Sequence, residues 1–313
     1  MKYAEKLKLL KLVSTSIESS IEAHDLRGLS SVASIESLSR QVLDSISRVQ
    51  YVYTIANKAY SASVADPNQS CFDPIKAAIY HRNLGNLDEA CWLIFLSIHF
   101  GKNRLSGWKL ARHFYAGPGT TCAWFNIMSH QQTLEPWLHT LSRIKSQKKS
   151  GLNFGNHRKY ESINPAKKDS TLKILLSYID WVTDYGDHAS MLSGPGAATR
   201  ISDHENFERI YSDMNILRFG RTAKFDYLSM IGKLGLANLE PGKAYLLNST
   251  GPLAGARLLF DGHRNSRTQI NVLESKIANL ATHLSLGKMQ MQVLEDALCN
   301  WQKSPQEFRR FSG

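Results

Sequence analysis

The sequence has few cysteines, no long apolar run and almost no strand pattern, and each absence narrows the class of protein. No stretch of 18 or more apolar residues occurs, so we expect no membrane span. The four cysteines form no CxxC pair, so neither a zinc ribbon nor a cysteine-held iron–sulfur cluster is expected: Cys71, Cys91, Cys122 and Cys299. A reducing, cytoplasmic setting fits this usage, and we expect no metal and no cofactor.

Acidic residues are scarce relative to basic ones. The chain has 38 Lys and Arg against 27 Asp and Glu, a formal net charge of +11, which favours a polyanionic partner. Much of the excess lies in residues 143–168, where eight basic residues accompany a single acid, Glu161. Glycine, asparagine and proline interrupt this segment, so we expect a loop. Such a basic loop suits a nucleic-acid groove, although a plain solvated loop has the same composition.

Apolar residues at helical spacing dominate the rest of the chain. Two helices, over residues 2–22 and 35–56, are assigned to an N-terminal module, residues 1–70. The segment 88–100 is apolar on nearly every side and is expected to be the buried central helix of a second domain, residues 71–313. Alternating strand patterns are almost absent. The predicted fold class is therefore all-α.

The stretch from Asn215 to Leu247 is the one around which we expect the chain to be organised. It predicts a short helix over 215–217, a turn at 218–221 in which Gly220 takes a positive φ, and a helix over 222–234 closed by Gly235. Unpaired amides and the dipole of the second helix would form an anion site. Arg218 and Arg221 flank that site, and Lys224 follows about one helical turn later.

These residues resemble a known superfamily. The run Gly220-Arg221-Thr222-Ala223, followed by an apolar helix and an acid seventeen positions after the alanine, resembles the helix-hairpin-helix DNA glycosylases. The strings ACWLIFLSIHFGK, LNFGNHRKYES, FGRTAKFDYLSMIGKLGLANLEPG and STGPLAGARLLFDG resemble the α-glutamyl/putrescinyl thymine pyrophosphorylase family. This resemblance implies a helix-hairpin-helix glycosylase-like domain and a link to hypermodified bases in phage DNA and to defence against phage.

The resemblance also implies roles for particular residues. Glu240 falls where the superfamily has its essential aspartate, and Asp226 is a competing carboxylate on the second helix. Either would stabilise an oxocarbenium-like sugar. Arg221 with Thr222 occupies the place of the lysine of lyase members, which implies a monofunctional enzyme. The expected DNA contacts are Arg218, Phe219, Gly220, Arg221, Thr222, Lys224, Arg158 and Lys159.

A base lifted out of the duplex also needs a pocket or wedge. The candidates for it share hydrogen-bonding or aromatic side chains: Asn156, His157, Tyr160, Glu161, Asp180 and Trp181. The leading hypothesis is a DNA glycosylase that removes a hypermodified pyrimidine, such as glucosylated hydroxymethylcytosine or a substituted thymine, from double-stranded phage DNA. The alternatives are a phage base-exchange enzyme and a non-catalytic helical DNA-binding protein. No obligatory protein partner is implied.

Overall fold

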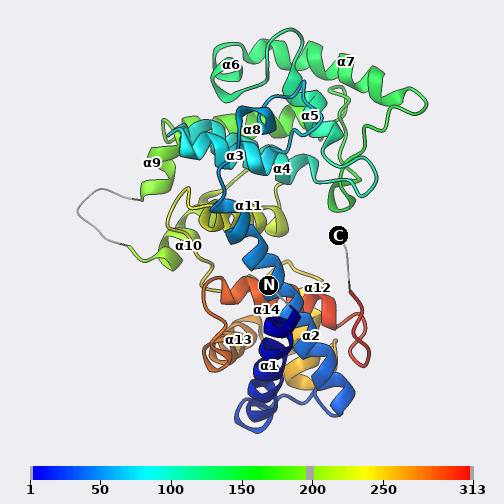
Figure 1. The fold of residues 1–313 in the computed structure, drawn as a ribbon, viewed down its shortest axis with the longest axis vertical. Helices are drawn as coiled ribbons and strands as arrows, with labels where there is room; N and C mark the ends of the chain where they lie inside the picture. The colour runs from blue at the N-terminus through cyan, green and yellow to red at the C-terminus, as the bar shows by residue number, and fades with distance from the viewer. Residues whose placement is uncertain (1–2, 195–200, 311–313) are drawn as a thin grey trace. The chain divides into compact units, whose positions relative to one another are not determined.

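The computed structural model describes residues 3–194 and 201–310, and in these residues the regular elements are helices (Figure 1). Fourteen α-helices occur in the described ranges, together with two isolated bridges and no strand. The prediction of an all-α protein is confirmed. None of the described helices combines the length and apolar character needed to cross a membrane.

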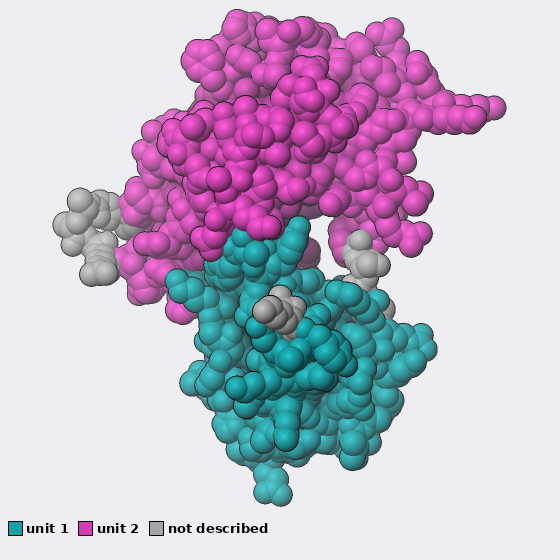
Figure 2. All heavy atoms as spheres, viewed as in Figure 1, with its two compact units in different colours: residues 1–54, 240–312 teal, residues 55–239, 313 magenta. Residues whose placement is uncertain are grey.

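The chain divides into two compact units, coloured separately in Figure 2. Unit 1 comprises residues 1–54 and 240–312, and unit 2 comprises residues 55–239. The predicted division into a module of residues 1–70 and a domain of residues 71–313 stays a prediction about domain organisation.

Unit 1 is built from α1 (Tyr3–Ala23), most of α2 (Val32–Ala56), α12 (Gly251–Asp261), α13 (Ile270–Leu284) and α14 (Gln290–Trp301). Its core includes Ile17, Val42, Phe260 and Trp301. Gly255 sets the spacing of α12 and α14, because a Cβ there would lie 2.3 Å from the Leu298 carbonyl oxygen. Both halves of unit 1 therefore share one hydrophobic core, although they are far apart in sequence.

Unit 2 contains α3 (Pro74–Asn83), α4 (Leu87–Phe100), α5 (Lys109–Ala116), α6 (Trp124–Ser129) and α7 (Leu134–Ser146). It continues with α8 (Thr171–Thr183), α9 (His188–Ser193), α10 (Asp203–Asp213) and α11 (Arg221–Lys233). The predicted central helix is confirmed as α4, which is buried over most of its length. Asn86 caps its start, and Gly101, with φ +65°, ends it.

The connection from α10 to α11 differs from the prediction. Residues 214–220 contain no helix, so the short helix expected at 215–217 is wrong. Gly220 has φ −73° and ψ −171°, which is extended backbone, and Arg218 takes the left-handed conformation instead, with φ +56°. The helix that follows, α11, and its closure by Gly235 at φ +68° agree with the prediction.

Candidate functional site

The start of α11 is open. Gly220 is its N-cap residue and supplies no side chain, so this end has no capping hydrogen bond from the N-cap residue. A Cβ placed on Gly220 would meet no atom within 4 Å, so the space beside it is free. Hydrogen bonding along the helix begins with the Lys224 amide, which donates to the Gly220 carbonyl oxygen at 3.1 Å. The first turn of α11 therefore presents the kind of amide donors that bind anions.

Phe219 anchors this connection in the interior of unit 2. Its side chain is 2% exposed, and its ring lies 5.4 Å from Phe95 and 6.2 Å from Tyr227, measured between centroids. Its amide donates to the Ile216 carbonyl oxygen at 3.0 Å. Neither the ring nor the amide is available to DNA. The expected DNA contact through Phe219 therefore has no support in the geometry.

Arg218 holds the connection against the basic loop. Its Nε lies 3.2 Å from Glu161 Oε2 and its Nη1 lies 3.6 Å from Asp169 Oδ2. The Glu161 side chain is 6% exposed, whereas the Arg218 side chain is 39% exposed, so the carboxylate is shielded from solvent and the guanidinium remains partly accessible. Two residues predicted to contact substrate thus contact each other, because their charges are opposite and their segments are adjacent.

The loop with the sequence NHRKYE is fixed at the C-terminal end of α4. The Gly155 amide donates to the Phe100 carbonyl oxygen at 2.8 Å, and Asn103 Nδ2 donates to the Phe154 carbonyl oxygen at 3.0 Å. A Cβ on Gly155 would lie 2.8 Å from the Gly101 carbonyl carbon, so the two backbones can approach this closely only with glycine. The loop is therefore positioned by backbone contacts.

Arg158 links this loop to the start of α11. Its Nε donates to the Ile98 carbonyl oxygen at 3.1 Å, and its guanidinium lies 5.5 Å from the centroid of the Phe219 ring. Burial lowers the pKa of Arg158, and the negative charges of Asp226 and Glu161 oppose that effect. The guanidinium is half-buried, and the charge of Asp226 favours its protonated form.

Asp226 has the most unusual surroundings of the predicted residues. Its half-buried carboxyl has a pKa raised by burial, and four positive groups act against the rise: Lys233, Arg158, Arg221 and His157. Within the described ranges its carboxylate accepts no hydrogen bond. A carboxyl surrounded by cations and lacking a hydrogen-bonding partner suits a reactive role.

The face of α11 that carries Asp226 is polar along its length. Thr222, Asp226, Ser229 and Lys233 follow the spacing i, i+4, i+7, i+11, which puts them on one face. Thr222 is exposed, whereas Ser229 and Lys233 are buried. The Ser229 hydroxyl is buried without a hydrogen-bond partner. Ser229 and Lys233 were missed at the sequence level, although the spacing was visible there.

Glu240, the other candidate carboxylate, belongs to unit 1. Its Oε1 accepts a hydrogen bond from the Met289 amide at 2.7 Å. Met289 is the N-cap residue of α14 and has φ +61°. Glu240 therefore stabilises the start of α14 in unit 1 through this hydrogen bond.

The remaining predicted DNA-binding residues differ in accessibility. Lys224 Nζ donates to the Tyr211 carbonyl oxygen at 3.2 Å and lies 5.4 Å above the Tyr211 ring, and burial lowers its pKa. Lys224 thus joins α11 to α10. Lys159 is exposed, with its Nζ 5.1 Å from the ring of Tyr160, which is 80% exposed. Asn156 and His157 are exposed as well.

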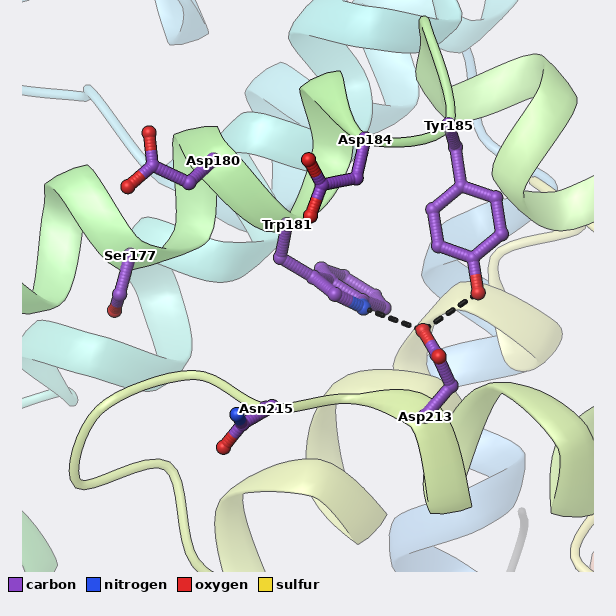
Figure 3. Close-up of a pocket in the computed structure, with 7 residues that line it drawn as sticks. All are labelled: Ser177, Asp180, Trp181, Asp184, Tyr185, Asp213 and Asn215. Carbon is purple, nitrogen blue, oxygen red and sulfur yellow. Dashed lines mark hydrogen bonds between the residues drawn. The ribbon is translucent and has the colours of Figure 1, made fainter.

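Asp180 and Trp181 line a separate pocket of about 440 Å³ between α8 and the end of α10 (Figure 3). Trp181 Nε1 donates to Asp213 Oδ2 at 3.0 Å, and the Tyr185 hydroxyl donates to the same oxygen at 2.5 Å. Asp184 completes the acidic lining. Of these residues, Asp213 and Tyr185 had not been predicted. Asp213 lies in the last turn of α10, where a negative charge opposes the helix dipole, and this is a weak signal of a local role.

A buried hydrogen-bonded chain crosses unit 2. His188 Nδ1 lies 2.7 Å from Asp88 Oδ1, His188 Nε2 lies 2.7 Å from the Tyr178 hydroxyl, and that hydroxyl lies 3.0 Å from the Tyr227 hydroxyl. Hydrogen bonding to His188 lowers the pKa of Asp88, and burial lowers the pKa of His188. We infer a neutral imidazole that donates to an ionised Asp88. In the described part of the chain, no group of His, Cys, Asp and Glu is arranged to hold a metal ion.

Comparisons with known proteins bear on the family. No curated protein and no solved structure matches the chain. The model of the family described as alpha-glutamyl/putrescinyl thymine pyrophosphorylase clade 3 matches residues 33–313, which is most of the chain. The protein therefore belongs to the alpha-glutamyl/putrescinyl thymine pyrophosphorylase family, clade 3.

Proposed function

We propose that the protein is a DNA glycosylase that removes a hypermodified pyrimidine from phage DNA and leaves an abasic site. The observation that carries the proposal is Asp226, a half-buried carboxyl without a hydrogen-bonding partner in the described chain, near His157, Arg158, Arg221 and Lys233. The family relationship supports a substrate among modified thymines or related bases.

The chemistry requires a negative charge beside the sugar. When the N-glycosidic bond breaks, positive charge develops on the sugar ring, and an ionised carboxylate offsets it in the transition state. Burial raises the pKa of Asp226, whereas the neighbouring charges of Lys233, Arg158 and Arg221 act in the opposite direction and favour its ionised form. In this proposal Asp226 stabilises the sugar cation and orients the attacking water. Glu240, which accepts a hydrogen bond from the Met289 amide, has a supporting role.

DNA would be held by the first turn of α11 and the basic loop. The N-terminal turn of α11, with Arg221 and Thr222, suits a backbone phosphate through its amide donors and the helix dipole. Lys159 and the exposed Tyr160 ring lie on the loop fixed to α4 and suit a strand and an unstacked base. Arg221 and Thr222 stand where lyase members of the superfamily place a lysine, so we propose a monofunctional enzyme, and Lys224 joins α11 to α10 by donating to the Tyr211 carbonyl oxygen.

The base pocket is proposed to be polar. Asn156 and His157 are exposed hydrogen-bonding side chains on the same loop as Arg158. A hypermodified base carries polar substituents that unmodified thymine lacks, so such side chains would select it. Excision of these bases would damage an invading genome and leave unmodified host DNA intact. The protein would then act in anti-phage defence in the cytoplasm.

A second candidate function is exchange of a group on the base, and the family description favours it through the word pyrophosphorylase. The cations near Asp226 would then bind a pyrophosphate group instead of stabilising a sugar intermediate. In this reading the glycosidic bond stays intact and the substituent of the base changes.

One experiment separates the two functions. The protein is incubated with phage DNA that carries modified pyrimidines and with matched unmodified DNA, and abasic sites are then cleaved with alkali. Glycosylase activity gives strand breaks in modified DNA only, together with free base detected by mass spectrometry. New nucleosides without breaks support exchange. DNA binding with neither product points to a non-catalytic DNA-binding protein and contradicts both.

A further inference from the structure

Unit 1 carries a pocket of its own, of about 320 Å³, formed by α1, α2 and residues 308–310. Its lining combines apolar and positively charged side chains, chiefly Tyr3, Lys6, Leu7, Arg40, Phe308 and Arg310. None of these residues takes part in the base excision proposed above. The pocket therefore calls for a separate explanation.

The first half of α1 carries apolar side chains that are largely exposed among the described residues. Tyr3 is 78% exposed and Leu7 is 50% exposed, and the first buried residue of this helix is Val13. Tyr3, Lys6, Leu7 and Leu10 follow the spacing i, i+3, i+4, i+7, so they share one face. Large apolar side chains gathered on an exposed helical face mark an interaction surface. The helix precedes the range 33–313 that matches the family, so this face lies outside the matched region.

The rim of the pocket is positive. Lys6 has no ionic partner in the described chain, and Arg40 lies 5.9 Å from the Phe308 ring while pairing with Glu36 at 2.6 Å. Arg310 pairs with the nearly buried Asp44 at 3.3 Å and remains 72% exposed. Both arginine side chains keep donors on the surface, so a partner with carboxylates would find complementary charge.

The chemistry of this surface selects among possible occupants. A second copy of the chain would bring the same positive rim against itself, which costs energy through like-charge repulsion. Nucleic acid would pair with the positive charges, but its backbone would not bury the leucine side chains. A helix that binds a lipid surface lays its apolar face into the lipid, whereas this face lines a hollow together with α2 and residues 308–310. A helix with apolar and acidic residues matches both the shape and the charge.

We propose that this face docks an acidic amphipathic helix of a partner protein. Leucine-like side chains of that helix occupy the pocket beside Leu7, and its Asp or Glu side chains lie over Lys6, Arg40 and Arg310. This inference is independent of the proposed glycosylase activity.

The test uses the full chain and a defined probe. The probe is a fluorescein-labelled helical peptide of roughly five turns, with leucine at i, i+3, i+4 and i+7 and glutamate elsewhere. Binding is followed by fluorescence anisotropy. We expect saturable binding that Leu7→Ser and Lys6→Glu each weaken by about tenfold or more. Leu12→Ser is the matched control, because Leu12 is 57% exposed on the same helix and does not line the pocket.

Several outcomes would overturn the proposal. They are absence of saturable binding, equal binding of a matched peptide with lysine in place of glutamate, and equal binding by the Leu7→Ser and Leu12→Ser variants. Binding to phosphatidylserine vesicles or to an oligo-dT strand that Leu7→Ser weakens, with no binding of the acidic peptide, would identify a different occupant. Circular dichroism of each variant establishes that helix content is unchanged.

Discussion

Replacing Tyr178 with phenylalanine tests the buried hydrogen-bonded chain of unit 2. The Tyr178 hydroxyl lies 2.7 Å from His188 Nε2 and 3.0 Å from the Tyr227 hydroxyl, and all three side chains have no exposed surface. The substitution removes one oxygen and keeps the aromatic ring, which stacks on Phe95 at a centroid distance of 3.8 Å. The change therefore isolates the hydrogen bonds from the packing.

The expected loss follows from the groups left behind. His188 Nε2 loses its partner inside the protein, and the Tyr227 hydroxyl loses Tyr178 while keeping its hydrogen bond with Cys91. A buried polar group without a partner costs about 1–3 kcal/mol. His188 carries that cost in full and Tyr227 in part, so we expect the free energy of unfolding to fall by roughly 2–4 kcal/mol. No cavity beyond one oxygen atom is created, so the cavity contribution is small.

The measurement is urea unfolding followed by circular dichroism at neutral pH. Tyr160→Phe is the control: its side chain is 80% exposed, so its loss of a hydroxyl should change the free energy of unfolding by less than about 0.5 kcal/mol. If Tyr178→Phe behaved like Tyr160→Phe, the buried chain would not contribute to stability, and the reasoning would be refuted.

Three further predictions concern pH, loop position and DNA binding. Burial raises the pKa of Glu89 to about 7, so the folded state keeps a proton that the unfolded state releases near pH 4.5. The free energy of unfolding should therefore fall as pH rises from about 4.5 to 7. Glu89→Gln should remove this pH dependence from the urea midpoints. Burial lowers the pKa of His99 to about 3, so this residue makes the free energy of unfolding rise with pH between about 3 and 6.5. The contribution of Glu89 is therefore read from the difference in urea midpoint between the Glu89→Gln variant and the parent protein at each pH. Gly155→Ala places a Cβ 2.8 Å from the Gly101 carbonyl carbon. The substitution should lower the free energy of unfolding by about 1–3 kcal/mol and the excision rate by about tenfold or more, because the loop must shift. Unchanged single-turnover excision rates would contradict this expectation. Arg221→Ala should weaken DNA binding and reduce the slope of log K against log salt by roughly one, and an unaltered slope in anisotropy titrations would exclude a phosphate contact.

The parts of the fold that follow from local periodicity could be predicted from the sequence. The apolar run before Gly101 gave the central helix α4, and the spacing of apolar residues before Gly235 gave α11. Both depend on contacts within a few residues and on a glycine that ends the helix. Such signals are present in any window of the chain, so they do not require knowledge of the fold.

The arrangement of the site depends on contacts between distant segments, and local patterns do not encode these. Arg218 pairs with Glu161, and His188 pairs with Asp88 one hundred residues earlier. The turn before α11 was assigned its positive φ at Gly220 because glycine adopts it most easily, whereas Arg218 takes it and is held there by its two ion pairs. Tertiary contacts thus outweighed the local preference.

The proposed preference for Asp226 over Glu240 rests on observations that the sequence does not contain. Sequence spacing favours Glu240, with Asp226 as a competing carboxylate, because spacing counts positions along the chain and carries no information about surroundings. The Met289 amide donates a hydrogen bond to Glu240, and four basic side chains act on the pKa of Asp226. Electrostatic surroundings of this kind arise only when the loop at Arg158 and α11 come together.

The most direct test of the central claim is alkali-revealed strand cleavage of modified phage DNA by the Asp226→Asn variant, with Glu240→Gln measured in parallel. We predict that Asp226→Asn binds this DNA and yields at least about a hundredfold fewer abasic sites, because it removes a charge needed in the transition state. Glu240→Gln should keep most of the activity when its folding is intact. Full cleavage by Asp226→Asn would contradict the account.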